Sequence, residues 1–174
     1  MTFVARENEL SSLQAEYERD YASLVAIYGR RRIGKTELID HFIAQKDTLS
    51  FAVTGAYDAT LKSHLANFAD KLSVTFGGSF TFSSWDEAFV ALRNNITEHT
   101  KHNSQKTIIF IDELPWLAEM KNNGFMSALS LFWNDFASKR KDIFMIVCGS
   151  ATSWIIKHVI EDKGCERVIK SHTK

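Results

Sequence analysis

Eight consecutive residues have the spacing of a phosphate-binding loop. The segment Gly29-Arg30-Arg31-Arg32-Ile33-Gly34-Lys35-Thr36 places a lysine and a hydroxyl residue directly after its second glycine. Such a loop wraps an anion with backbone N–H groups, and side chains at the glycines would block that approach. We expect Lys35 to reach the β- and γ-phosphates of a nucleotide, and Thr36 to ligate Mg²⁺. We also expect Glu37, the next residue, to be part of this cofactor-binding segment.

A carboxylate pair, Asp112-Glu113, follows the apolar run Thr107 to Ile111. Beside a phosphate-binding loop, Mg²⁺ needs a hard carboxylate ligand, usually through water, and Asp112 fits that role. Glu113 would then polarise the water that attacks the γ-phosphate. An Asp-Glu pair at a strand end is also common as a solvated turn, so its functional interpretation depends on the loop.

Other residues near these segments have two interpretations each. Ser150, after the apolar run 143–148, could hydrogen-bond the γ-phosphate or the attacking water, or cap the helix that begins near Thr152. The arginines Arg30 to Arg32 could pair with phosphate or a neighbouring subunit, or face solvent. Trp116, after the sole proline Pro115, is interpreted as a packing anchor for the loop beyond Glu113 rather than a base-stacking residue. Cys148 is interpreted as inert core.

The pattern of apolar residues predicts the elements that must position these groups. Strands are predicted where short apolar runs end in glycine or polar residues, and helices where apolar residues recur at helical spacing. Ser84 and Glu87 form a capping-box signature for one of these helices. The predicted strands are 24–28, 49–54, 107–111 and 143–148; the predicted helices begin near Glu7, Lys35, Leu61, Ser84 and Phe125.

Alternation of strands and helices predicts an α/β fold, a three-layer core whose parallel sheet carries helices on both faces. Ligands bind such sheets at the carboxyl ends of the strands. Gly29, Asp112 and Gly149-Ser150 all follow predicted strands directly. The fold therefore brings the candidate residues to one edge of the sheet.

Composition narrows the classes of partner. The 174 residues fit one domain. Equal numbers of basic and acidic residues, 21 each, give no global field for nucleic acid or an acidic membrane. No apolar stretch approaches the roughly 18 residues of a membrane span. Cys148 and Cys165 are too few for a disulfide framework, which favours a reducing cytoplasm.

Four segments in this order resemble the bacterial and archaeal AAA-like ATPases of the signal-transducing STAND class, relatives of the origin-recognition ATPases. The segments are 3–10, 29–36, 109–117 and 147–151. The resemblance implies that the opening segment lies against adenine, with Val4 and Arg6 as binding residues, although Ala5 replaces the usual glycine. It also implies an arginine that senses the γ-phosphate, for which Arg167 is the candidate.

The resemblance further implies a five-stranded core followed by a helical lid and a C-terminal domain. With Lys174 as the last residue, we expect one domain composed of an adenine-side helix (1–20), a core (21–160) and a truncated tail (161–174). Only Val168-Ile169 suggests a fifth strand. We therefore expect the sheet to be incomplete at its C-terminal edge, with an exposed strand edge beside the loop-bearing strand that could self-associate or bind a protein partner.

Two functions remain in competition. The leading prediction is an ATPase core that binds ATP with Mg²⁺ and hydrolyses it to ADP and phosphate. The alternative is a hydrolysis-deficient nucleotide switch or scaffold within a signalling or DNA-associated assembly, which a missing lid would favour because lids exclude water. A DNA-remodelling role rests on fold analogy alone, and the sequence has no strong nucleic-acid signal.

Overall fold

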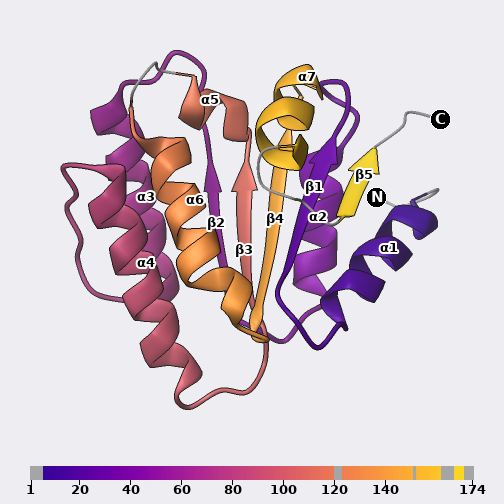
Figure 1. The fold of residues 1–174 in the computed structure, drawn as a ribbon, viewed down its shortest axis with the longest axis horizontal. Helices are drawn as coiled ribbons and strands as arrows, with labels where there is room; N and C mark the ends of the chain where they lie inside the picture. The colour runs from indigo at the N-terminus through magenta and orange to yellow at the C-terminus, as the bar shows by residue number, and fades with distance from the viewer. Residues whose placement is uncertain (1–5, 120–122, 151, 162–166, 171–174) are drawn as a thin grey trace.

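The computed structural model describes residues 6–119, 123–150, 152–161 and 167–170, with the last four described as backbone only. Strands and helices alternate along the chain (Figure 1). The strands are β1 (Ser23–Tyr28), β2 (Ser50–Thr54), β3 (Thr107–Asp112), β4 (Ile143–Gly149) and β5 (Arg167–Lys170). The helices are α1 (Glu7–Tyr17), α2 (Lys35–Ala44), α3 (Leu61–Phe76), α4 (Trp85–Thr100), α5 (Leu114–Ala118), α6 (Phe125–Asp135) and α7 (Thr152–Ile155), with short 3₁₀ and π turns at Ala137–Lys139 and Ile156–Glu161.

The strands form one parallel sheet in the order β2-β3-β4-β1-β5. Because all strands run the same way, their carboxyl ends meet at one edge, at the top of Figure 1. The register pairs Tyr28 with Gly149 and Thr54 with Asp112. The loops after β1, β3 and β4 therefore emerge side by side.

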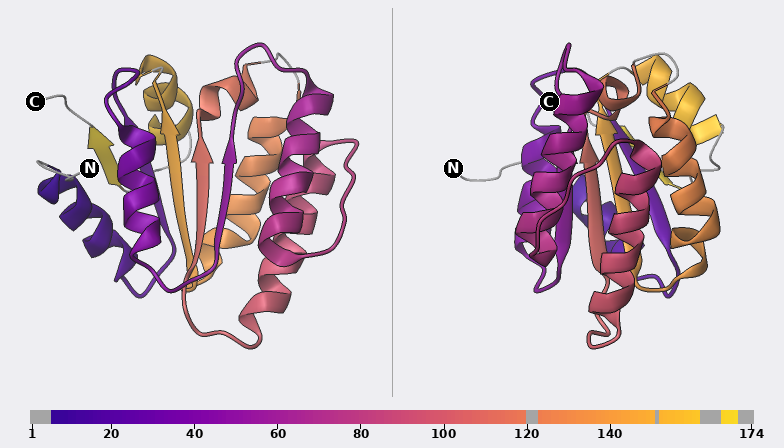
Figure 2. Two further views of the ribbon diagram at one scale, coloured as in Figure 1. Left: turned by 180° about the vertical axis from the view of Figure 1, so that it is seen from behind. Right: turned by 90° about the vertical axis from the view of Figure 1, so that its left-hand side faces the viewer.

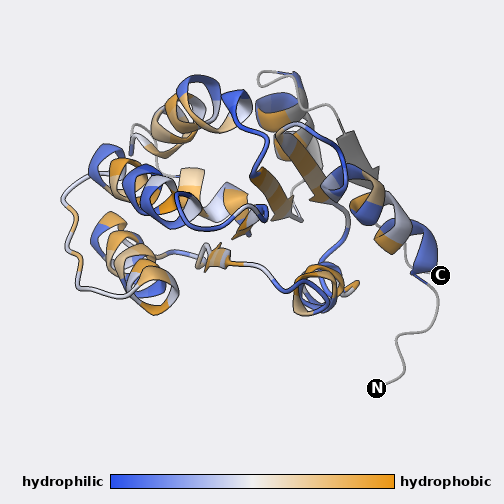
Figure 3. Ribbon diagram, turned by 90° about the horizontal axis from the view of Figure 1, so that it is seen from below, coloured by the Kyte–Doolittle hydropathy of each residue, from blue (hydrophilic) through white to orange (hydrophobic). Residues whose placement is uncertain are grey.

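Two hydrophobic cores lie on opposite faces of the sheet. Alternate residues of β1 supply them: Val25 and Ile27 pack with α1 and α2, whereas Leu24 and Ala26 face the core shared by α3, α4, α6 and α7. Viewed from its edge, the sheet has helices on both sides (Figure 2). The central strands are coloured hydrophobic while the helices carry both colours (Figure 3), as two-sided burial requires. The predicted α/β, three-layer architecture is confirmed.

Local signals fix several helix ends. The Ser84 hydroxyl accepts a hydrogen bond from the Glu87 N–H at the start of α4, and the Glu87 carboxylate accepts one from the Ser83 N–H. The first of these bonds is the one that the capping-box pattern predicts, whereas the second comes from the residue before the N-cap rather than from the N-cap itself. Thr60 caps α3 in the same way through the Ser63 N–H. Gly77, with a φ of 80°, ends that helix.

Two expectations are wrong. The edge of β1 is not exposed: β5 pairs with it in parallel, joining Val25 to Arg167 and Tyr28 to Lys170. The tail thus completes a five-stranded sheet rather than leaving it open at that edge. The segment after Glu113 is not a plain loop, because Pro115 lies in the first turn of the short helix α5. A proline there costs nothing, since the N–H that it lacks would have no partner within the helix.

Candidate functional site

The loop between β1 and α2 contains two residues in the left-handed backbone conformation. Gly34, the residue before α2, has a φ of 73°, and Arg32 has a φ of 61°, both in the left-handed region. Lys35 is 6% exposed, and its ammonium group donates to the carbonyls of Gly29 at 3.1 Å and Arg30 at 2.7 Å. The lysine thus folds over the loop with its charge inside the concave backbone. This arrangement suits an anion held by N–H groups at a helix N-terminus.

The metal-site candidates of the sequence are in direct contact. The Thr36 hydroxyl donates to Asp112 Oδ2 at 2.7 Å, and the Glu113 N–H donates to Asp112 Oδ1 at 2.9 Å. Asp112 is 4% exposed, so both oxygens of a buried carboxylate are oriented. A hydroxyl and a carboxylate are the hard oxygen ligands that Mg²⁺ takes, with water and phosphate oxygens completing its shell. These residues fit a Mg²⁺ site.

Glu113 has a left-handed backbone conformation, and the pKa of its carboxyl group is raised. Its φ of 48° lies in the left-handed region, which non-glycine residues adopt at a cost. Partial burial raises the pKa of its carboxyl and the Asp112 carboxylate raises it further, while Lys35 and Arg31 act in the opposite direction. A carboxylate with a raised pKa is a stronger proton acceptor. This environment is compatible with the general-base role expected of Glu113.

Ser150 lies where the ends of β3 and β4 meet. It hydrogen-bonds the Glu113 side chain, and its hydroxyl accepts from Arg31 Nε at 3.2 Å. The guanidinium carbon of Arg31 lies 4.7 Å from the centroid of the Trp116 ring. Tyr57 meets the same ring edge-on at 5.8 Å. We call Lys35, Thr36, Asp112, Glu113 and Ser150 the strand-end cluster, and Arg31 with Trp116 borders it.

Two glycines allow the backbone segments to approach each other. A Cβ on Gly55 would lie 2.5 Å from the carbonyl oxygen of Glu113, and one on Gly149 would lie 2.7 Å from Pro115 Cδ. Real Cβ atoms do not come so close, so both positions need glycine. The left-handed turn at Glu113 is packed between the loop after β2 and the end of β4.

Some of the other predicted site residues lie at the phosphate-binding loop, and others do not. Arg6 donates to the carbonyl of Gly34 at 3.3 Å, which brings the start of α1 to the phosphate-binding loop. Glu37 and the side chains of Arg30 and Arg32 are exposed at the loop, and Ile33 is buried beneath it. Val4 lies outside the described residues.

Arg167 begins β5 at the level of Val25, three positions before β1 ends, and its side chain lies outside the described part.

Two neighbours of the site were not predicted from the sequence. Asp40 lies one helical turn after Thr36, and burial together with the Asp112 charge raises its pKa. Its spacing of four from Thr36 on α2 was a usable signal, because such residues share a helix face. Cys148 is fully buried core as expected, yet its thiol also hydrogen-bonds Asp112. Burial, the largest cause, raises the pKa of that thiol, so it stays protonated.

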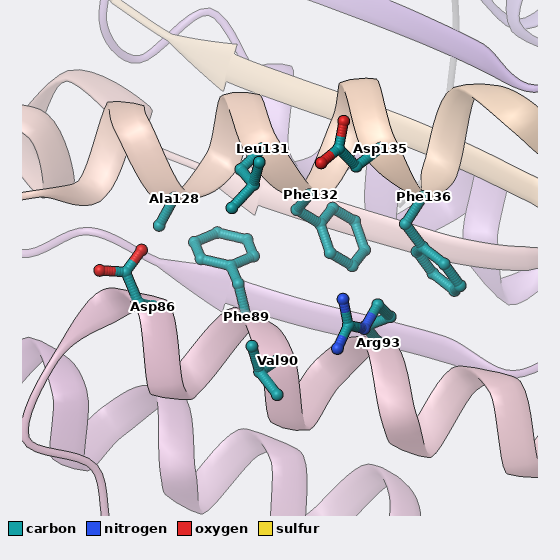
Figure 4. Close-up of a pocket in the computed structure, with 9 residues that line it drawn as sticks. All are labelled: Asp86, Phe89, Val90, Arg93, Ala128, Leu131, Phe132, Asp135 and Phe136. Carbon is teal, nitrogen blue, oxygen red and sulfur yellow. The ribbon is translucent and has the colours of Figure 1, made fainter.

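An apolar groove lies elsewhere, between α4 and α6 (Figure 4). Phe89, Val90, Leu131 and Phe132 supply most of its lining, with Asp86, Arg93 and Asp135 at its rim. Neither helix contributes a residue to the strand-end cluster. This groove is therefore separate from the candidate nucleotide site.

The fold and the strand-end cluster define a P-loop NTPase core. The chain belongs to a family described as the ATPase domain predominantly from Archaea, whose model matches residues 3–171. An uncharacterized protein of Methanocaldococcus jannaschii is 28% identical in an alignment over 163 residues, which covers 92% of this chain and 32% of that protein. An uncharacterized ATP-binding protein of the same organism is 46% identical over 44 residues, 25% of this chain and 75% of that protein.

Solved structures share the fold. A Walker-type ATPase of Pyrococcus abyssi aligns with 98% of this chain and 54% of its own, at a TM-score of 0.56 and 20% identity. Cdc6p from Pyrobaculum aerophilum aligns with 96% of this chain and 45% of its own, at a TM-score of 0.62 and 14% identity. The chain thus spans about half the length of these structures, and about a third of the longer curated relative. Within the described residues, no helix is long and apolar enough to cross a membrane.

Proposed function

We propose that this chain binds ATP with Mg²⁺ and hydrolyses it to ADP and phosphate. The observation that carries the proposal is the contact between Thr36 and Asp112, at 2.7 Å. Lys35 precedes the first of these residues in the chain, and Glu113 follows the second. This contact joins the phosphate-binding loop to the carboxylate pair. The segment shared with an ATP-binding protein supports ATP as the nucleotide.

Each member of the cluster has a proposed role. Lys35 and the N–H groups of residues 29–36 hold the β- and γ-phosphates. Thr36 and Asp112 hold Mg²⁺, which neutralises charge on the phosphates. Glu113 accepts a proton from the attacking water, and Ser150, hydrogen-bonded to Glu113, orients that carboxylate. Val4 and Arg6 hold the adenine side, and Arg167 senses the γ-phosphate.

The chain acts as the motor or switch module of a larger cytoplasmic ATPase of the signal-transducing class. Its share of its relatives' length, 32% to 54% for the three longest, supports a modular role. A hydrolysis-deficient switch would keep the same phosphate and metal contacts but would not use Glu113 as a base.

Single-turnover hydrolysis separates the enzyme from the switch. Excess protein is mixed with MgATP, and ADP is quantified for the wild type and for Glu113→Gln, which keeps the size of the side chain but cannot accept the proton. The wild type should convert ATP at least about 100-fold faster than the variant, as expected for loss of a general base. Lys71→Ala, on the exposed side of α3, is the control. Equal and near-zero rates for wild type and variant would identify a switch.

A further inference from the structure

Arg31 is the loop residue whose side chain reaches both neighbouring strand ends. Its Nε donates to the Ser150 hydroxyl, after β4, at 3.2 Å. Its guanidinium carbon lies 4.7 Å from the ring centroid of Trp116, in the helix that follows β3. Ser150 belongs to the strand-end cluster, so these two contacts hold the guanidinium at the border of that cluster. Three segments far apart in the sequence thus converge on one guanidinium.

The position of Arg31 in the loop separates it from Lys35. Lys35 begins α2 and turns its ammonium group inward to the Gly29 and Arg30 carbonyls. Arg31, two residues after Gly29, instead reaches Ser150, the residue that the proposed function places beside the catalytic carboxylate. The two cations therefore approach the cluster from opposite ends of the loop. Arg31 is solvent-exposed, so it can exchange Ser150 for a phosphate oxygen without first crossing a buried environment.

We propose that Arg31 recognises the terminal phosphate from within the same chain, which makes it a specificity-determining residue for a nucleoside triphosphate over a diphosphate. This inference rests on the proposed function. The planar guanidinium matches two phosphate oxygens at once, which an ammonium group cannot do. The indole ring of Trp116 packs against the face of the guanidinium by cation–π attraction. Because this contact already restricts the Arg31 side chain, less of its conformational entropy is lost when phosphate binds. Tyr57, against that ring, supports Trp116 in turn.

Arg30 and Arg32, the arginines on either side of Arg31, do not make its contacts with Ser150 and Trp116. Arg30 contributes its carbonyl to Lys35, and its own side chain is exposed. The backbone of Arg32 is left-handed, with a φ of 61°, and forms part of the turn of the loop. Of these three described residues, Arg31 is the one whose guanidinium contacts both the β4 end and α5. The contacts of Arg31 resolve which arginine of the triplet acts on the nucleotide.

Calorimetry with two ligands tests the inference without any need for turnover. Wild type and Arg31→Ala are titrated with MgADP and with the magnesium complex of β,γ-imido-ATP, a non-hydrolysable triphosphate. Loss of a charge-assisted contact should weaken triphosphate affinity by about 10- to 100-fold. Affinity for ADP should change by less than about threefold, since ADP lacks the phosphate that Arg31 contacts. Retained ADP binding also shows that the variant is folded.

Three further variants sharpen the result. Arg31→Lys keeps the charge but loses the planar fork, so it should recover part of the lost triphosphate affinity. Trp116→Leu removes the support for the guanidinium and should cost less than Arg31→Ala. Arg93→Ala, at the groove between α4 and α6, removes an arginine far from the loop and should change neither affinity.

Each outcome is decisive. Selective loss of triphosphate affinity in Arg31→Ala supports the inference. An unchanged triphosphate affinity, or an equal loss for both nucleotides, overturns it while leaving the proposed function intact. A wild type that binds neither nucleotide overturns the proposed function itself, together with the inference that rests on it.

Discussion

The hydroxyl of Thr36 donates a 2.7 Å hydrogen bond to the carboxylate of Asp112, although 76 positions separate the two residues. Thr36 belongs to α2, and Asp112 is the last residue of β3. The contact therefore joins the phosphate-binding loop to the acidic end of that strand. A hydroxyl beside a buried carboxylate presents the hard oxygens that Mg²⁺ takes as ligands, so we propose that Thr36 and Asp112 hold the metal.

Replacement of Thr36 with valine should remove most of the benefit that Mg²⁺ gives to ATP binding. Valine keeps the branched shape but has no oxygen to offer the metal or Asp112. In wild type, ATP affinity measured by calorimetry should be higher with MgCl₂ than with EDTA, and in Thr36→Val that gain should shrink by about 10-fold or more. Thr97→Val, in α4, is the matched control because the Thr97 hydroxyl bonds within its own helix, to the Arg93 carbonyl. An undiminished magnesium effect in Thr36→Val would remove Thr36 from the metal site.

Gly55→Ala should disturb Glu113 from the end of the neighbouring strand β2. The new Cβ would lie 2.5 Å from the Glu113 carbonyl oxygen, so one of the two backbone segments must move. We expect a loss of about 1 to 3 kcal/mol in the free energy of unfolding, measured by urea denaturation, and slower single-turnover hydrolysis.

Gly124→Ala separates these two effects. Gly124 precedes α6 and has a φ of 81°. Alanine there should also lower stability, by about 1 to 2 kcal/mol, because an L side chain is disfavoured in the left-handed region. A Cβ at Gly124 would meet no atom within 4 Å, so Glu113 should not be displaced and hydrolysis should be unchanged. Hydrolysis at the wild-type rate in Gly55→Ala would show that Glu113 tolerates the shift.

Acid should destabilise the fold through His64. This α3 residue is 3% exposed, its Nε2 accepts a hydrogen bond from the Ala56 N–H at 3.1 Å, and burial lowers the pKa of the imidazole. A group whose folded pKa is below its unfolded pKa binds protons preferentially in the unfolded chain, so stability falls as pH decreases below the unfolded value of about 6.5. The loss can reach about 1.4 kcal/mol per pH unit until the folded state also titrates.

The variant His64→Gln keeps an acceptor for Ala56 but does not titrate in this range. Urea denaturation between about pH 7.5 and about pH 5.5 should show a smaller decline for this variant than for wild type. His102→Gln, at the exposed end of α4, should keep the wild-type decline. Parallel declines for wild type and His64→Gln would mean that another group controls the acid response.

The local parts of this molecule were predictable. The apolar run of β1, the two loop glycines and the apolar stripe of α2 all lie within about 20 consecutive residues, so short-range pattern determines them. The Ser84 cap of α4 was also predicted, because both partners lie within one turn. Once three strand ends carry polar residues, parallel topology alone brings Gly29, Asp112 and Ser150 to one edge.

The parts that depend on distant contacts were not predictable. Strand β5 has only four residues, and although Val168-Ile169 suggested a strand, its pairing with β1 was not evident from so short a run. Arg31 and Ser150 are 119 positions apart, so their contact left no trace in local spacing. The same limit applies to Trp116 of α5, whose partner Tyr57 comes from the loop after β2.

ATP binding to wild type and Lys35→Ala is the most direct test of the central claim, that residues 29–36 hold the phosphates of a nucleotide. Calorimetric titration with MgATP should give saturable one-site binding for wild type and an affinity about 100-fold weaker or more for Lys35→Ala, because the buried ammonium group contributes a charge-assisted contact to the phosphates. Lys71→Ala should bind as wild type does. Equal affinities for wild type and Lys35→Ala would contradict the assignment of the loop.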